Sequence, residues 1–232
     1  MDNLKVVARI RNAFESKFGV PRQSGLAEAV VSEIVFEPEF RAAEALRGIE
    51  GFSHLWLIWG FDRNGREEWK PTVRPPRLGG NQRVGVFATR SPFRPNAIGL
   101  SCVKLLGTEK TAEGTVLKVA GADLVSGTPI YDIKPYLPYT DCRPEATGGF
   151  TEQTEKRRVT VVIPEELKKQ APAELTEGLA AALAEDPRPA YQEDPDRIYA
   201  FEFGGYHAAF RVREGILTVE ILEKRQNEKN GL

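Results

Sequence analysis

The sequence predicts a mainly β protein, a single-sheet and mostly antiparallel β-barrel followed by a smaller C-terminal α+β domain. Short segments rich in Val, Ile, Leu and aromatic residues recur up to Tyr136, with Gly and Pro between them, as in successive strands. Helical crossover segments do not separate these runs, so antiparallel pairing is favoured over a doubly wound parallel sheet. The composition then changes after Tyr139. The strands expected in the barrel are residues 6–10, 29–36, 54–61, 84–89, 100–106, 115–120 and 129–136.

Three segments of the barrel region have distinct patterns. Residues 54–61 (HLWLIWGF) are apolar on both faces, which is typical of a central strand covered on both sides. Residues 40–47 end at Gly48 and place apolar side chains on neighbouring turns, which predicts a two-turn helix with a left-handed glycine after it. The connection 62–82 is rich in Pro and Gly, and a loop of that length is usually functional or disordered.

Three divisions of the chain follow from these patterns. Residues 1–142 form the expected barrel domain, and residues 143–156 form a linker because the chain from 141 to 153 is rich in Gly, Thr, Pro and Glu. Residues 157–232 form the C-terminal unit. Its expected elements are a strand at 158–163, a helical region at 164–184 that Pro164 opens, and a meander at 199–203, 208–212 and 217–222.

Composition excludes several classes of protein. The chain has 41% hydrophobic and 28% charged residues and a net charge of −1, which is ordinary for a folded protein. Its two cysteines, Cys102 and Cys142, fit a reducing cytoplasm, and the longest apolar run is too short to span a bilayer. His54 and His207 have no partner at helical spacing, so a metal site or a Ser-His-Asp triad is not expected. The glycines do not fit a G-x-G-x-x-G dinucleotide fingerprint.

Positive charge is concentrated in residues 63–104, which hold nine basic and two acidic side chains. Seven of the nine are arginines, whose planar guanidinium suits phosphates and stacks on bases. The alternative is a solvated loop. Within this region lies ATRSPFRPNAIGLS (88–101), where Pro92 and Pro95 should hold the chain stiff and extended. A guanidinium on a stiff loop loses less entropy when it binds an anion.

A second polar cluster follows Gly127 and Pro129, which mark a turn. Asp132, Lys134 and Tyr136 alternate with apolar residues, so an extended strand would point all three to one face. Such a group could transfer protons, or it could be a solvent-exposed face with a salt bridge. The sequence leaves both interpretations open.

Four segments in this order closely resemble the TrmO family, also called TsaA-like or YaeB-like: ALRGIEGFSHLW (45–56), KPTVRPPRLGGN (70–81), VGVFATRSPFRPNAIGLS (84–101) and DLVSGTPIYDIKPYLPYTD (123–141). The resemblance covers roughly residues 4–141, and DPRPAY (186–191) is similar to the extra domain of the longer bacterial members. It implies S-adenosylmethionine-dependent methylation of the exocyclic nitrogen of threonylcarbamoyladenosine, next to the anticodon of threonine tRNA. It also implies a homodimer in the cytoplasm.

The resemblance assigns roles to individual residues. The methyl donor is expected at the barrel rim, near a dimer interface, in contact with Pro21, Arg22, Gln23, Asp62, Arg63, Arg90, Leu100, Asp123, Leu124, Val125 and Ser126. The catalytic residues are a separate hypothesis about the mechanism: Asp132 accepts the nitrogen proton with Tyr131 or Tyr136 nearby, and Lys134 helps to position the substrate. Arg74, Arg77, Arg94 and Asn96 are expected to bind the anticodon stem-loop.

Two rival functions remain at this point. One is a non-catalytic RNA-binding barrel, which would bind tRNA without any dependence on S-adenosylmethionine. The other is a methyltransferase with the same donor and another substrate.

Overall fold

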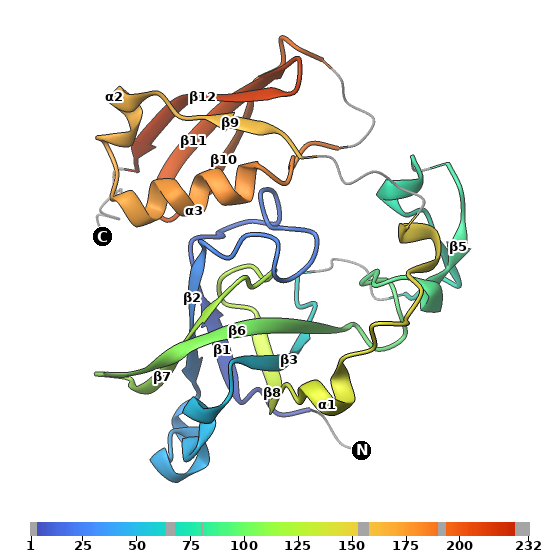
Figure 1. Cartoon of the computed structure of the whole chain (residues 1–232), viewed down its shortest axis with the longest axis vertical. Helices are drawn as coiled ribbons and strands as arrows, with labels where there is room; N and C mark the ends of the chain where they lie inside the picture. The colour runs from blue at the N-terminus through green and yellow to red at the C-terminus, as the bar shows by residue number, and fades with distance from the viewer. Residues whose placement is uncertain (1–3, 64–67, 80, 153–157, 190–193, 226–232) are drawn as a thin grey trace, which may run out of the picture.

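The computed structural model describes residues 4–63, 68–79, 81–152, 158–189 and 194–225. These residues form one six-stranded sheet, a separate four-stranded sheet near the C-terminus and a two-stranded hairpin between them in the chain. Figure 1 shows the four-stranded sheet above the six-stranded one, with the hairpin off to one side. The mainly β architecture and the separate C-terminal sheet that the sequence predicts are confirmed.

The six-stranded sheet pairs antiparallel throughout, in the order β1-β2-β7-β6-β3-β8. Its strands are β1 (Ala8–Arg11), β2 (Val31–Phe36), β3 (His54–Gly60), β6 (Ile98–Thr111), β7 (Gly114–Ala120) and β8 (Pro129–Pro135). Ala8 pairs with Phe36 of β2 on one side and with Ile130 of β8 on the other. Because β1 pairs with both neighbours, the sheet closes on itself as a barrel.

Alternate side chains of each strand fill the interior of the six-stranded sheet. In β3 the side chains of Leu55, Leu57 and Trp59 are buried, whereas those of His54, Trp56 and Ile58 face outward and are half-buried. The expectation that both faces of this strand are covered therefore holds only for the inner face. The interior cluster also contains Ile10, Ile34, Val103, Leu117, Val119 and Ile130.

Two local expectations were wrong. Residues 40–47 do not form a two-turn helix. The chain there makes short 3₁₀ turns at Pro38–Phe40, Ala43–Leu46 and Ile49–Gly51, which bury no residue fully and therefore gain little from packing. Gly48 does take the expected left-handed conformation, at φ +86°. Residues 84–89 are mostly not a strand.

Instead, β5 (Val84–Gly85) pairs only with β4 (Thr72–Val73), and the chain then turns through a 3₁₀ helix at Val86–Ala88. A further 3₁₀ turn lies at Pro76–Leu78. The hairpin and these turns give some regular structure to the long connection that the sequence marks as a loop.

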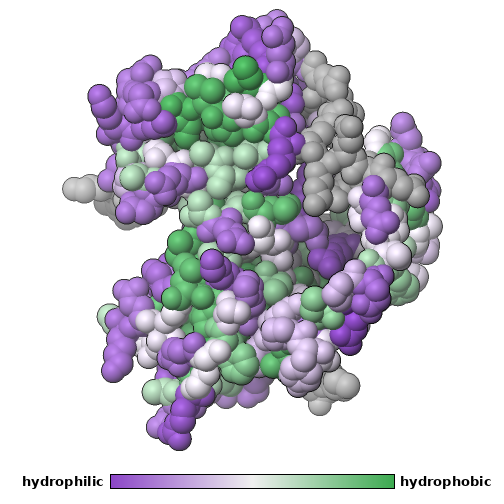
Figure 2. All heavy atoms as spheres, viewed as in Figure 1, coloured by the Kyte–Doolittle hydropathy of each residue, from purple (hydrophilic) through white to green (hydrophobic). Residues whose placement is uncertain are grey.

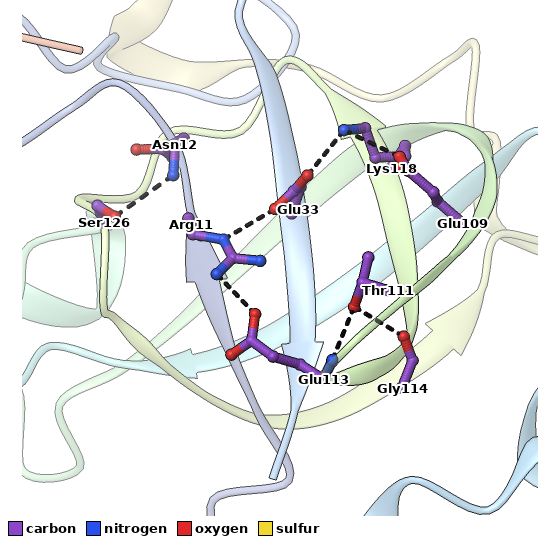
Figure 3. A network of polar contacts seen from close by, with 9 residues as sticks. All are labelled: Arg11, Asn12, Glu33, Glu109, Thr111, Glu113, Gly114, Lys118 and Ser126. Carbon is purple, nitrogen blue, oxygen red and sulfur yellow. Dashed lines mark hydrogen bonds and ion pairs between the residues drawn. The ribbon is translucent and has the colours of Figure 1, made fainter.

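Charged side chains join neighbouring strands on the outside of the barrel (Figure 3). Arg11 of β1 and Lys118 of β7 both reach Glu33 of β2, each at 2.8 Å. Arg11 also pairs with Glu113 at 2.7 Å. The hydrogen bond from Lys118 is the largest cause that lowers the pKa of the Glu33 carboxyl. This network joins β1, β2 and β7 at the side of the barrel away from β3.

The C-terminal sheet has the order β10-β11-β12-β9. It is built from β9 (Thr160–Val162), β10 (Tyr199–Phe203), β11 (Tyr206–Arg213) and β12 (Ile216–Lys224), with helices α2 (Glu165–Lys168) and α3 (Ala173–Leu183) between β9 and β10. The meander β10-β11-β12 is antiparallel as expected, and β9 is added in parallel to β12. Helix α1 (Pro138–Asp141) and a 3₁₀ turn at Gly149–Thr151 precede it.

The exact domain and linker boundaries, parts of which lie outside the described residues, stay a prediction. Among the helices described, none is long and apolar enough to cross a membrane.

Gly99 is expected to be intolerant of a side chain. It pairs with Trp59 across β3 and β6, and a Cβ at this position would overlap the Trp59 indole. The indole cannot shift freely because its N–H donates to Ser101 Oγ at 2.9 Å. We expect Gly99→Ala to lower the free energy of unfolding by about 1–3 kcal/mol, measured by denaturant titration. The control is Gly85→Ala, whose Cβ would meet no atom within 4 Å. Equal stability of the two variants would contradict this account.

Candidate functional site

A cavity of about 650 Å³ lies at one end of the barrel. Four segments line it: the loop after β1, the end of β3, the proline-rich loop that leads into β6, and the chain after β7. The space-filling view shows the surface hollowed where the barrel meets the segment that carries β5, with hydrophilic side chains around the hollow (Figure 2). The lining residues are Lys17, Val20 to Gln23, Trp59 to Arg63, Thr89, Arg90, Pro92 to Arg94, Ile98 to Leu100, Asp123 to Val125 and Thr128.

The proline-rich loop is held in shape by its own polar groups. The Thr89 hydroxyl accepts from the Ser91 N–H at 3.2 Å, and the Ser91 hydroxyl accepts from the Phe93 N–H at 3.3 Å. The Arg94 guanidinium turns back and donates to the carbonyl of Thr89 at 3.0 Å. These bonds supply rigidity in addition to that expected from Pro92 and Pro95.

A buried chain of hydrogen bonds runs from the barrel interior to the cavity. Trp59 Nε1 donates to Ser101 Oγ at 2.9 Å, and the Ser101 hydroxyl donates to Asp123 Oδ1 at 2.5 Å. Burial is the main cause that raises the pKa of the Asp123 carboxyl, against the hydrogen bond from Ser101 and the charge of Arg90. Asp123 is thus a poorly hydrated carboxylate that faces the cavity, where a hydroxyl or a cationic group of a ligand would offset its cost.

The basic side chains of the cavity hold its loops together. Arg63 donates to the carbonyls of Ser126 at 2.6 Å and Glu15 at 3.2 Å. Arg90 donates to Gln23 Oε1 at 2.5 Å. Carbonyl and amide oxygens carry no net charge, so they fix these guanidinium groups without neutralising them. The cavity therefore combines a positive surround with two carboxylates, Asp62 and Asp123.

Ten of the eleven residues predicted to contact a methyl donor line this cavity. The exception is Ser126, whose carbonyl binds Arg63 and whose hydroxyl accepts from the Asn12 N–H at 3.3 Å. The residues that the sequence places far apart are thus brought to one place. Their role as donor contacts stays a prediction.

The four predicted catalytic residues do not line the cavity. Asp132 and Lys134 form an ion pair of 2.9 Å on the outer face of β8, with side chains 47% and 62% exposed. Tyr136 contacts Trp56 on the same side, with ring centroids 5.8 Å apart. Tyr131 lies closest to the site, because its ring packs against Gly60, which lines the cavity. Both the salt bridge and the shared face that the sequence suggests are present.

Some of the predicted RNA contacts line the cavity and others do not. Arg94 lines the cavity, and Asn96 is exposed two residues beyond it. Arg74 is exposed on the segment that carries β4. The side chain of Arg77 lies outside what the structure describes.

Several lining residues were not predicted. The rings of Trp59 and Phe61 are in contact at the cavity edge, with centroids 4.3 Å apart and ring planes tilted by 58°. Their position at the end of HLWLIWGF, next to a loop, could have indicated an aromatic wall. Lys17 and Thr128 carry no comparable signal. Within the described ranges, no three His, Cys, Asp or Glu side chains are grouped as metal ligands.

Comparison with known proteins identifies relatives along most of the chain. The model for the tRNA-methyltransferase O N-terminal domain matches residues 9–142, and that for the TrmO C-terminal domain matches residues 156–225. The tRNA (adenine(37)-N6)-methyltransferase of Escherichia coli (strain K12) is 45% identical over 161 residues, which are 69% of this chain and 68% of the relative. A putative S-adenosylmethionine-dependent methyltransferase, RcsF, of Pseudomonas aeruginosa is 45% identical over 150 residues, which are 65% of this chain and 61% of the relative.

A solved structure agrees with these matches. The crystal structure of TrmO from Pseudomonas aeruginosa superposes with a TM-score of 0.78 at 31% identity and covers 96% of this chain and 98% of that one. The N-terminal model alone covers more than half of the chain. The chain therefore belongs to the tRNA-methyltransferase O (TrmO) family.

Proposed function

We propose that this chain transfers a methyl group from S-adenosylmethionine to the N6 nitrogen of adenosine 37 in tRNA, next to the anticodon. The observation that carries the proposal is the cavity, into which four separate segments of the chain bring carboxylates, arginines and aromatic rings. The names of relatives support both substrates: one is a tRNA (adenine(37)-N6)-methyltransferase and another an S-adenosylmethionine-dependent methyltransferase.

More specifically, the proposed substrate is threonylcarbamoyladenosine in threonine tRNA. The four motifs that resemble the TrmO family support this assignment. A base in the anticodon loop is single-stranded, so it can leave its stack and enter a protein cavity beside aromatic side chains. Trp59, Phe61 and Phe93 supply such side chains here.

The cavity fits S-adenosylmethionine in size and in chemistry. Its volume lies within the range of about 300–1,000 Å³ that is common for sites of small ligands. The donor carries an adenine ring, ribose hydroxyls, two positive charges and one carboxylate. Aromatic rings, the Asp123 carboxylate and the arginines offer a complement to each of these groups. Arg22, Gln23, Arg90, Leu100 and Asp123 are the residues proposed to hold it.

The bound donor supplies an electrophilic methyl group on a sulfonium. Transfer forms one nitrogen–carbon bond, breaks one sulfur–carbon bond and releases a proton from the nitrogen. The chain's contribution is alignment of the two reactants and acceptance of that proton. A rigid rim suits alignment, because the Thr89–Arg94 loop is already ordered by its internal hydrogen bonds.

We assign the proton acceptor to Asp132, assisted by Tyr131, Lys134 and Tyr136, and infer that it works in a homodimer. In one chain this face lies outside the cavity, so it reaches a nucleotide at the mouth only if a second copy packs there. Large apolar side chains support such packing. Ile98 and Leu100, which line the cavity, are 36% and 52% exposed, and Tyr139 is 85% exposed. Burial of these side chains in a dimer would be favourable.

The direct test is methyl transfer itself. The protein is incubated with isotope-labelled S-adenosylmethionine and with threonine tRNA that carries threonylcarbamoyladenosine, and the nucleosides are then analysed by mass spectrometry. We expect one labelled methyl on that nucleoside and none on a tRNA that has guanosine at position 37. Label on unmodified adenosine alone would support the methyltransferase but contradict the finer substrate. The absence of label from both would contradict the proposed function.

Asp123→Asn should separate donor binding from stability. The pKa of this carboxyl is higher in the folded protein than in the unfolded chain. Its contribution to the free energy of unfolding is therefore greatest at low pH, where the carboxyl is protonated, and falls as the pH rises and the carboxyl ionises. The amide removes this cost. We therefore expect unfolding free energy at pH 7 at or above that of the unmodified protein, with the Kd for S-adenosylmethionine raised about tenfold. Calorimetry and denaturant titration measure the two. A large loss of stability with unchanged Kd would contradict both statements.

Asp132→Asn should act on turnover alone. The side chain is half-exposed and its carboxylate faces Lys134, so the fold does not depend on it. We expect kcat to fall by about 10²-fold or more, which is typical for loss of a proton acceptor, with the donor Kd unchanged. The matched control is Glu39→Gln, which removes an exposed carboxylate paired with Lys5 at 3.1 Å. Equal kcat for the two variants would remove Asp132 from the mechanism.

A further inference from the structure

The loop that joins β1 to β2, residues 12–30, connects two strands of the barrel but packs in the core of the C-terminal domain. Phe14, Ala27 and Val30 are buried in the cluster that forms the core of the C-terminal domain. Phe14 bridges to Phe203 of β10, and their rings meet edge to face with centroids 5.5 Å apart. In Figure 1 this loop lies between the barrel and helix α3.

Polar contacts hold the loop from both sides. The Gly204 N–H donates to the carbonyl of Ala13 at 2.8 Å, and the Glu15 carboxylate accepts from the Gly205 N–H at 2.7 Å and from Arg225 at 3.0 Å. On the barrel side, the carbonyl of Glu15 accepts from Arg63, which lines the cavity. Two hydrogen bonds to the same residue, Glu15, therefore connect the C-terminal sheet with Arg63 at the cavity.

The same loop then forms a wall of the cavity. Gly19, at φ +89°, passes so close to Phe201 that a Cβ would lie 2.5 Å from its ring. Pro21, Arg22 and Gln23 follow directly and line the cavity. The C-terminal sheet thus supports the chain immediately before the residues that face the ligand.

A second contact joins the C-terminal domain to Arg22. After α3 the chain turns at Asp186, which has the left-handed φ of +47° and is only 7% exposed. Asp186 accepts two hydrogen bonds from the Arg188 guanidinium, at 2.8 and 2.9 Å. The carbonyl of Arg188 in turn accepts from Arg22 Nη2 at 3.2 Å.

The turn costs free energy in isolation, because a non-glycine residue in the left-handed region is strained by roughly 1–3 kcal/mol. The paired hydrogen bonds between a carboxylate and a guanidinium compensate for this strain. Their effect is to fix the direction of the Arg188 carbonyl. A neutral carbonyl holds the Arg22 guanidinium in place and leaves its charge intact, and within the described residues Arg22 forms no ion pair.

We propose that Asp186 is a positioning residue for substrate binding. Through Arg188 it fixes Arg22 at the cavity, so that Arg22 can bind an anionic group of one of the two substrates. That group is either the carboxylate of S-adenosylmethionine or a phosphate of the tRNA. The C-terminal domain then contributes directly to the site that the barrel forms. This inference rests on the proposed function for the identity of the two substrates.

The test is a double-mutant cycle read by direct binding. The variants are Arg22→Gln, Asp186→Asn and their combination, with the Kd for S-adenosylmethionine measured by calorimetry and the Kd for a tRNA transcript by fluorescence anisotropy. Asn keeps the size of Asp and tolerates the left-handed conformation, so it removes mainly the charge. Asp196→Asn is the control, since it breaks an exposed pair with Arg213 of 2.8 Å in the same domain.

We expect Arg22→Gln to raise one of the two Kd values about tenfold, the effect of losing one charge-assisted hydrogen bond. Asp186→Asn should raise the same Kd about threefold, and the combination should bind no more weakly than Arg22→Gln alone, because Asp186 acts through Arg22. Arg22→Lys should restore part of the affinity. The control should change neither Kd, and which Kd rises tells which anion is bound.

Three results would overturn the proposal: additive effects of the two substitutions, no change of either Kd in Arg22→Gln, or an Asp186→Asn effect on the Kd that Arg22→Gln leaves unchanged. Thermal unfolding of each variant shows whether it is folded. If Asp186→Asn does not fold, Arg188→Lys replaces it in the cycle, because a lysine cannot make the paired hydrogen bonds. Binding does not require methyl transfer, so failure of the proposed function leaves this test intact.

Discussion

The hydrogen bonds from Trp59 through Ser101 to Asp123 are the interaction on which the cavity depends. They join β3, β6 and the chain after β7, three segments that must meet for the cavity to exist. Gly99 allows the indole to approach β6 closely, and the indole N–H then fixes the hydroxyl that donates to the carboxylate. A carboxylate that is largely removed from water is costly, and half-buried Asp123 is retained at the cavity surface, as is typical of groups that serve a ligand.

At this site, uncharged main-chain carbonyls hold the guanidinium groups in place by accepting their hydrogen bonds. Arg63 and Arg94 bind main-chain carbonyls, whereas Arg11 on the far side of the barrel binds Glu33 and Glu113. The first arrangement orders a guanidinium and keeps the local potential positive, but the second neutralises it. Because an anionic partner gains from uncompensated charge, the cavity end of the barrel suits the tRNA proposed as substrate, although the net charge of the whole chain is only −1.

Much of this could be predicted from the sequence, and the exceptions have physical causes. The positions of most strands along the chain follow from local pattern, because apolar runs and the turn residues between them act on their own neighbourhood. The helix expected at residues 40–47 failed because propensity without a buried face does not stabilise so short a segment. The contact between Arg22 and the carbonyl of Arg188 joins residues far apart in the chain. Every residue has a main-chain carbonyl, so the sequence does not indicate which one accepts this hydrogen bond. The separation of Asp132 from the cavity likewise depends on register, since β8 turns this residue outward beside Lys134.

A closed sheet has no crossover helices whose N-termini could bind a phosphate or a cofactor, so its binding site must be made from connecting loops. Loops are ordered only by what they contact, and each cavity loop here is ordered differently. The proline-rich loop is ordered by its own hydroxyls, the chain after β7 by Arg63, and the loop after β1 by the C-terminal sheet. The third case gives the C-terminal domain a structural role beside the closed barrel. The segment 12–30 carries Phe14 and Val30 into the other core, so the wall formed by Pro21 to Gln23 is as rigid as the packing between the two domains.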